Sequence, residues 1–145
     1  MKLLRKKRVD EIDPSSLREF ALTGKQGRIF AEGVELFNRG KFWEAHEAWE
    51  HIWREREEAS RIFFQGIIQA AAAFHLVFEK PRPAGAKNNC EKALTILELF
   101  PVRFLGIDVD ELRENLKAIL KELRRVDLSK TSDALKGLTP RMSAR

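Results

Sequence analysis

The chain of 145 residues has the length of one ordinary domain, and its 43% hydrophobic content argues against a wholly disordered protein. Its single cysteine, Cys90, excludes an internal disulfide and a cysteine-rich zinc site. Lysine and arginine number 27 against 22 acidic residues, so the formal net charge of +5 raises the question of nucleic-acid binding.

The excess positive charge lies at the amino-terminal end. Residues 2–8 hold five basic residues and no acidic one: Lys2, Arg5, Lys6, Lys7 and Arg8. Without them, basic and acidic residues are equal in number, at 22 each. We therefore predict a basic, flexible tail over residues 1–13. Nucleic acid is not expected as a partner except through this tail, which has no aromatic residue for stacking bases.

Helical periodicity dominates the segments that follow. Pro14, Ser15 and Ser16 with Glu19 predict a short helix ending near Gly24. A second helix is expected after Gly27 and ends at residues 38–40, and a third runs over residues 41–58. The fourth, over residues 61–79, is apolar nearly all round, which is typical of a central helix.

The uncharged run at residues 62–78 is short for a membrane span and carries Gln65, Gln69 and His75. We therefore interpret it as a buried helix and expect a cytoplasmic protein with no membrane partner. No hydrophobic segment of a secretory signal occurs near the start.

Two more helices complete the expected fold. One carries an apolar face with Ala86, Cys90 and Leu97 and ends before Pro101, and the other begins at a cap formed by Asp108 and Glu111. We predict an all-α fold: a single compact bundle of about five to six helices in antiparallel hairpins, spanning residues 14–126. Residues 127–145 are polar and are expected to form a frayed C-terminal tail.

The third helix carries the residues of greatest chemical interest. Its three tryptophans, Trp43, Trp49 and Trp53, are candidate pocket aromatics. At about 100° per residue, His46 lies about 40° from Phe42 and about 20° from Trp53, inside the apolar arc. Glu50 follows one turn later, so it and His46 can share a proton, a ligand or a metal.

Two glutamines on the central helix complete a candidate polar cluster. Gln65 and Gln69 also lie one turn apart, and an antiparallel hairpin would face them toward His46 and Glu50. A buried glutamine needs hydrogen-bond partners, so we expect one buried or half-buried cluster. Its candidate members are His46, Glu47, Glu50, Gln65 and Gln69. A polar network that only fixes the helix register remains the alternative interpretation.

The known metal and nucleophile motifs do not fit this sequence. A zincin requires His-Glu-x-x-His, but Glu50 takes the place of the second histidine, and the Glu-x-x-His motif of di-iron bundles does not occur at His46 or His75. No cofactor is expected, although a metal at His46 and Glu50 stays open with ligands from elsewhere. Cys90 lies on an apolar face and is expected in the core rather than as a nucleophile.

Two motifs resemble the DUF309 family of small all-helical proteins without an assigned activity. They are Phe37-Asn38-x-Gly40-x-Phe42-Trp43-Glu44-Ala45-His46-Glu47-x-Trp49-Glu50-x-x-Trp53 and Phe64-Gln65-Gly66-Ile67-Ile68-Gln69-Ala70-Ala71-Ala72. The resemblance covers about residues 29–125 and includes Gly85-Ala86. One departure is Arg82, near the place where the family tends to carry asparagine. A weaker resemblance to one tetratricopeptide unit supports a hairpin of the second and third helices.

Two hypotheses about function follow. The first is a non-enzymatic binding or scaffold module that meets a protein partner, and it is favoured because no complete catalytic set can be assembled. The second is a small-ligand binder or a hydrolase-type enzyme in which His46 acts as general base and Glu50 orients it. A cavity lined by both residues would favour the second hypothesis, whereas a sealed network would exclude it. A homo-oligomer is left open.

Overall fold

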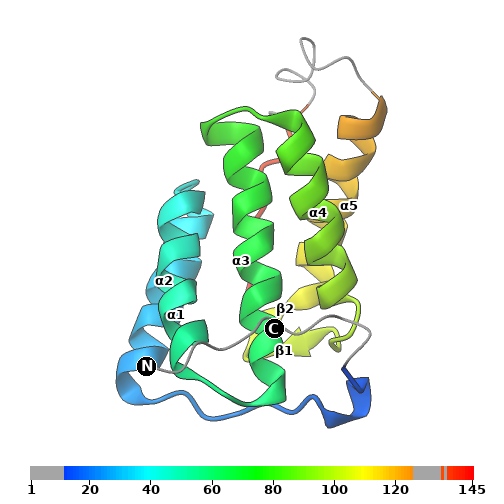
Figure 1. The fold of residues 1–145 in the computed structure, drawn as a ribbon. Helices are drawn as coiled ribbons and strands as arrows, with labels where there is room; N and C mark the ends of the chain where they lie inside the picture. Colours follow the sequence, from blue (N-terminus) through cyan, green and yellow to red (C-terminus); the bar gives the residue numbers. More distant parts are fainter. Residues whose placement is uncertain (1–11, 126–134, 136) are drawn as a thin grey trace.

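The computed structural model describes residues 12–125, 135 and 137–145. Within them the chain forms five α-helices: α1 (Gly24–Asn38), α2 (Phe42–Glu55), α3 (Ile62–Phe74), α4 (Pro83–Leu97) and α5 (Val109–Arg125). Between α4 and α5, β1 (Arg103–Phe104) and β2 (Ile107–Asp108) form a small antiparallel hairpin. The helices pack side by side in one bundle, which confirms the all-α prediction (Figure 1).

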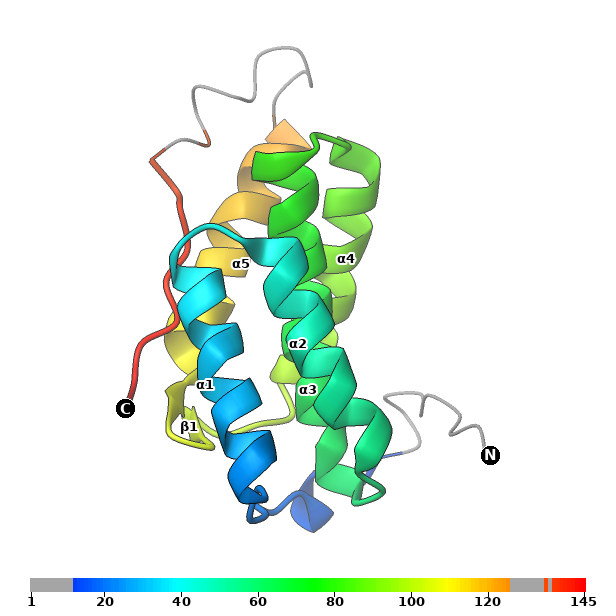
Figure 2. The ribbon, with the colours of Figure 1, turned by 90° about the vertical axis from the view of Figure 1, so that its left-hand side faces the viewer.

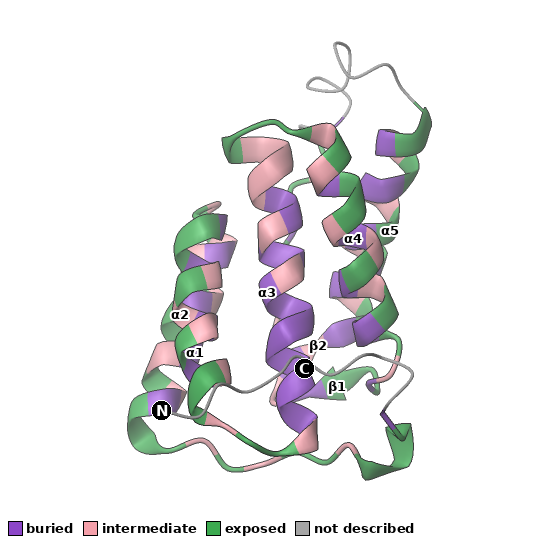
Figure 3. Cartoon of the chain, viewed as in Figure 1, coloured by how far each residue is buried: buried purple, intermediate pink, exposed green. Residues whose placement is uncertain are grey.

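The helix α3 lies at the centre of the bundle, between α2 on one side and α4 on the other (Figure 1). Most of its residues are buried, as the near-continuous apolar sequence predicted (Figure 3). At Gly66 a Cβ atom would lie 3.0 Å from side-chain carbons of Ile96 and Leu97, so the glycine permits a close approach of α3 and α4. The helix ends in one π-helical turn, His75–Glu79.

The segment Ala59–Glu79 is long and apolar enough to span a membrane by composition alone. However, 61% of its most apolar window is buried within the bundle, as expected for a core helix.

The antiparallel pair α1 and α2 is held by an unusually close contact. The Trp49 ring lies against Gly33, where a Cβ atom would come within 2.2 Å of the indole nitrogen. The indole N–H of Trp49 donates to the carbonyl of Phe30 at 3.3 Å, which satisfies the polar atom of this fully buried side chain. Trp49 therefore fixes the packing of α2 on α1.

Capping residues explain two helix starts. Thr23 and Gln26 form a capping box, so α1 begins three residues before the predicted Gly27. The Asp108 carboxylate accepts from the backbone N–H of Glu111 at 2.9 Å, which agrees with the cap predicted for the last helix.

Two local predictions were wrong. The helix expected from Pro14 to Gly24 is only a 3₁₀ turn, Pro14–Ser16, because the chain becomes extended at Leu17. The hairpin at residues 103–108 was not expected, because strands of two residues carry no alternating pattern. Its turn places Leu105 and Gly106 at positive φ angles of 49° and 77°.

The end of the chain packs against the bundle along α1 and α5 (Figure 2). Asn38 donates to the carbonyl of Met142 at 3.0 Å and accepts from its N–H at 2.7 Å, and the Met142 side chain is buried. Ala144 pairs with Ile107 beside the hairpin. We call residues 137–145 the C-terminal strap. The frayed tail expected over residues 127–145 is not observed for the strap, because long-range pairing holds its polar backbone; residues 127–134 and 136 lie outside the described residues.

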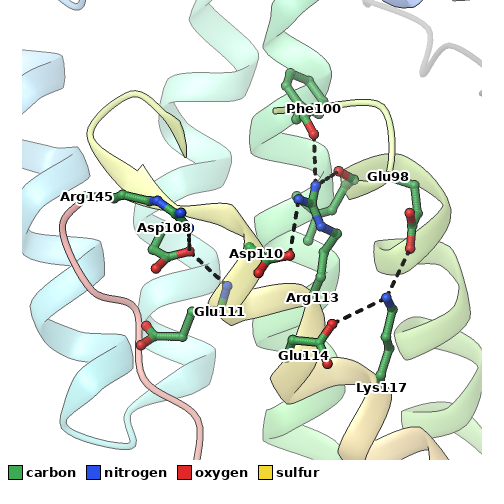
Figure 4. Close-up of polar contacts among 10 residues, drawn as sticks. Glu98, Phe100, Asp108, Asp110, Glu111, Arg113, Glu114, Lys117 and Arg145 are labelled. Atoms are coloured by element: carbon green, nitrogen blue, oxygen red, sulfur yellow. Dashed lines mark hydrogen bonds and ion pairs between the residues drawn. The ribbon is translucent and has the colours of Figure 1, made fainter. Parts of the chain in front are cut away.

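Polar side chains at the start of α5 connect this helix to its neighbours (Figure 4). Arg145 donates to Asp108 at 3.0 Å, and Ser143 donates through its N–H and hydroxyl to Glu111 at 2.9 and 3.1 Å. On the other side, the buried guanidinium of Arg113 donates to the carbonyls of Leu97 and Phe100, both at 2.8 Å. Side chains in the N-terminal part of α5 thus form hydrogen bonds with polar groups of the strap and with backbone carbonyls at the end of α4.

Candidate functional site

His46 and Glu50 lie one turn apart on α2, on the side that faces α3. Their side chains are 16% and 31% exposed, so both are partly buried but reachable from solvent. The His46 Nδ1 and Glu50 Oε2 atoms are 3.7 Å apart, which is longer than a hydrogen bond but close enough for electrostatic coupling. The other Glu50 oxygen, Oε1, accepts from Arg54 at 2.6 Å.

The two glutamines approach from α3. Gln65 is 9% exposed, and Gln69 is partly buried with its Oε1 atom fully enclosed. No described residue donates a hydrogen bond to this Gln69 oxygen. A buried amide oxygen without a donor costs free energy, so a network that existed only for stability would not be expected to leave it in this state.

The four polar side chains surround one cavity between α2 and α3. Its volume is about 130 Å³, and its lining consists of His46, Glu50, Trp53, Gln65, Ile68 and Gln69. The helical spacing of the sequence led to the expectation that His46, Glu50, Gln65 and Gln69 meet, and the structure brings them together around this space. We call this space the α2–α3 pocket.

The three tryptophans occupy different environments. Trp53 lines the α2–α3 pocket, and the guanidinium of Arg61 lies over its ring at 4.3 Å. Trp49 is fully buried in the α1–α2 contact, where it faces Gly33, and it is not among the residues that line the α2–α3 pocket. Trp43 is 45% exposed at the start of α2.

Trp43 joins His46 to a second histidine, His75. Its ring stacks on His46 at a centroid distance of 4.6 Å and lies 5.1 Å from His75. The carboxylate of Glu79 contacts both Trp43 and His75. Its Oε1 atom accepts from the Trp43 backbone N–H at 3.1 Å and lies 3.1 Å from His75 Nδ1. The helical spacing of His75 and Glu79 was the available signal for their contact.

A wider hollow lined by residues of α1 and α2 shares His46 and Glu50 with the pocket. Its volume is about 580 Å³, and its remaining lining residues are Ile29, Glu32, Trp43, Glu47, Ala48, His51 and Arg54. Glu47 therefore lines this hollow and not the α2–α3 pocket, from which it points away. Among the described residues, three glutamates and one arginine line the hollow, so this part of its lining is acidic.

The remaining predicted candidates do not join the site. Cys90 is fully buried on α4, and burial raises the pKa of its thiol to about 12, so the thiolate that a nucleophile requires is not favoured. Among residues 12–125, 135 and 137–145, no group of three or more His, Cys, Asp or Glu side chains is placed to hold a metal ion. The basic tail at residues 2–8 lies outside the described part of the chain.

The fold and the site define a helical bundle with one half-buried polar pocket between neighbouring helices. Residues 30–89 match the model of the "Domain of unknown function (DUF309)", which confirms the family resemblance carried by the motifs on α2 and α3. The chain is also 27% identical over 113 residues to an uncharacterized protein of Aquifex aeolicus (strain VF5). That alignment covers 77% of this chain but 33% of the relative, so the chain spans about a third of the relative's length.

Proposed function

We propose that this protein is a binding module that holds a small polar molecule in the α2–α3 pocket. The observation that carries the proposal is the enclosed Oε1 atom of Gln69, which accepts no hydrogen bond from any described residue although it lines a cavity. A ligand that donates to this oxygen would remove the cost of burying it. The exposed fraction of Glu50 supports access to the pocket from solvent.

The chemistry of the pocket favours binding over catalysis. His46 and Glu50 provide one base and one carboxylate, while Gln65 and Gln69 provide amides that can orient a ligand through directed hydrogen bonds. A hydrolytic role for His46 would need Glu50 to orient its ring, but the 3.7 Å separation leaves the two atoms outside hydrogen-bond distance. Binding requires no such alignment, so it is the function that the geometry supports best.

A fragment titration monitored by NMR tests this function. Full-length, ¹⁵N-labelled protein is titrated with a set of neutral, cationic and anionic fragments that fit a cavity of about 130 Å³. We expect saturable shifts of the Gln65 and Gln69 side-chain amides. The variant Ile68→Phe, which places a larger ring in the lining, should bind more weakly, whereas Val102→Phe at an exposed position should behave as the native protein.

Two results would contradict the proposed function. The first is that no fragment of any charge gives saturable shifts at the two glutamines. The second is that the fragments bind the folded Ile68→Phe variant as tightly as they bind the native protein, because binding would then take place elsewhere.

A further inference from the structure

We infer that the ligand of the α2–α3 pocket is a small organic cation, with an ammonium or guanidinium group and a short stem. The inference rests on the proposed function and adds the chemical class of the ligand. It comes from the hydrogen-bond acceptors, the charge and the volume of the pocket, which are considered in turn.

The acceptors in the pocket favour a ligand that donates hydrogen bonds. The enclosed Oε1 atom of Gln69 accepts nothing from the described residues. Glu50 adds a carboxylate, of which Oε1 is held by Arg54 at 2.6 Å while Oε2 faces His46 at 3.7 Å, beyond hydrogen-bond distance. An ammonium or guanidinium group, which donates and does not accept, can bond to both an amide oxygen and a carboxylate.

The charge of the lining favours a cation over an anion. Among the described residues, Glu50 is the acidic residue of the pocket lining, and no lysine or arginine of this part of the chain belongs to it. Of the two nearby guanidinium groups, Arg54 pairs with one oxygen of Glu50, Oε1, at 2.6 Å and partly offsets its charge. Arg61 lies over the Trp53 ring and donates to the Trp53 carbonyl at 3.1 Å. Glu32 and Glu47 in the adjoining hollow add negative charge near the entrance. This distribution would attract a cation and repel a carboxylate or a phosphate.

The volume limits the size of the bound group. A cavity of about 130 Å³ corresponds to roughly four water molecules at their share of about 30 Å³ in the liquid. It therefore accommodates a head group with a few carbon atoms. The indole of Trp53 lines the same cavity and offers an aromatic surface of the kind that attracts cations.

Matched probes of different charge test the inference. Methylguanidinium and n-propylammonium are compared with neutral acetamide and anionic propionate, each titrated into the full-length protein at constant ionic strength. We expect the cations to give saturable shifts at Gln65 and Gln69 and to bind at least tenfold more tightly than propionate. Glu50→Gln should weaken cation binding by roughly tenfold, as expected for the loss of one charge-assisted hydrogen bond. Glu44→Gln, on the same helix outside the pocket lining, should change it less than twofold.

The outcomes separate the inference from the proposed function. Binding of acetamide or propionate at the two glutamines without binding of the cations would overturn the cation inference and leave the small-molecule function intact. Cation binding that is unchanged in Glu50→Gln would also overturn the inference, because the carboxylate would not be recognising the charge. A complete absence of binding across the wider fragment set would reject the proposed function itself.

Discussion

At the scale of single residues, the glutamines Gln26 and Gln69 differ in which groups satisfy their side-chain amides. Gln26 donates to Glu55 and accepts from Arg56, both at 3.0 Å, so its amide is fully used in joining α1 to the end of α2. Gln69 has an enclosed oxygen to which no described residue donates. The first arrangement is typical of a residue kept for stability, and the second of a residue kept for binding.

This difference predicts opposite effects of the same substitution. Gln69→Leu should leave the free energy of unfolding unchanged or raise it by about 1 kcal/mol, because it removes an unsatisfied buried oxygen. Gln26→Leu should lower it by about 1–3 kcal/mol, because it removes the hydrogen bonds to Glu55 and Arg56 and the capping box with Thr23. Urea denaturation of both variants measures the difference. A clear loss of stability in Gln69→Leu would show that the pocket residues form a structural network.

The close contact at Gly33 yields a second prediction. Gly33→Ala places a methyl group within 2.2 Å of the Trp49 indole nitrogen, so we expect a loss of about 2–3 kcal/mol as the ring is displaced. Gly27→Ala, in the same helix, meets nothing within 4 Å and should instead gain about 0.5–1 kcal/mol from its higher helix propensity. Thermal unfolding of the two variants compares them. Equal stabilities would mean that α1 and α2 do not approach this closely in solution.

At the scale of elements, the cap of α5 joins three parts of the chain. The Asp108 carboxylate accepts from the backbone N–H of Glu111 and from Arg145 of the strap, and β2 ends at the same residue. The N–H of Glu111 is the largest cause that lowers the pKa of Asp108 below the ordinary 3.8, and Arg145 contributes further. The folded state therefore favours the ionised form of this residue.

The lowered pKa makes the contribution of this cap dependent on pH. Asp108→Ala should lower the free energy of unfolding by about 1–2 kcal/mol at neutral pH, while Asp110→Ala, at a more exposed position of the same turn, should have a smaller effect. Because the folded pKa lies below the unfolded value, the contribution of Asp108 is complete above about pH 4 and is lost as the pH falls through the folded pKa. Denaturation curves of native protein and variant should therefore converge in acid. A difference that grows toward acid pH would contradict this.

The elements that the sequence could predict are those with a long periodic signal. The stripe on α2 and the apolar run of α3 predicted two neighbouring helices, and the spacing of His46, Glu50, Gln65 and Gln69 predicted that their side chains meet. The cavity between them could not be predicted, since it depends on how far the helices stand apart. The stacking of Trp43 on His46 depends in the same way on side-chain rotamers rather than on position along a helix.

At the scale of the whole molecule, the C-terminal strap connects elements that are distant in sequence. Met142 is bonded through its backbone to Asn38 of α1, and Ser143 is bonded to Glu111 of α5. These hydrogen bonds join residues more than 100 and about 30 positions apart in the sequence. Sequence patterns among neighbouring residues could therefore not predict them. The strap therefore links the first helix to the last.

We expect the strap to contribute measurably to the stability of the bundle. Met142→Ala removes a side chain that is 1% exposed and should lower the free energy of unfolding by about 2–4 kcal/mol. Arg141→Ala, at the neighbouring exposed position, is the control and should change it by less than about 0.5 kcal/mol. Amide hydrogen exchange gives a second measurement, since the N–H groups of Met142 and Ser143 should be protected. Rapid exchange of both amides would mean that the strap leaves the bundle in solution.

The strap is synthesised after the helices that it bridges. The five helices precede residues 137–145 in the chain, so they leave the ribosome before the segment that bridges α1 and α5. Until then, the amide of Asn38 and the carboxylate of Glu111 have to be hydrated, and the hairpin edge at Ile107 is uncovered. The hairpin therefore has an unpaired strand edge until Ala144 pairs with Ile107.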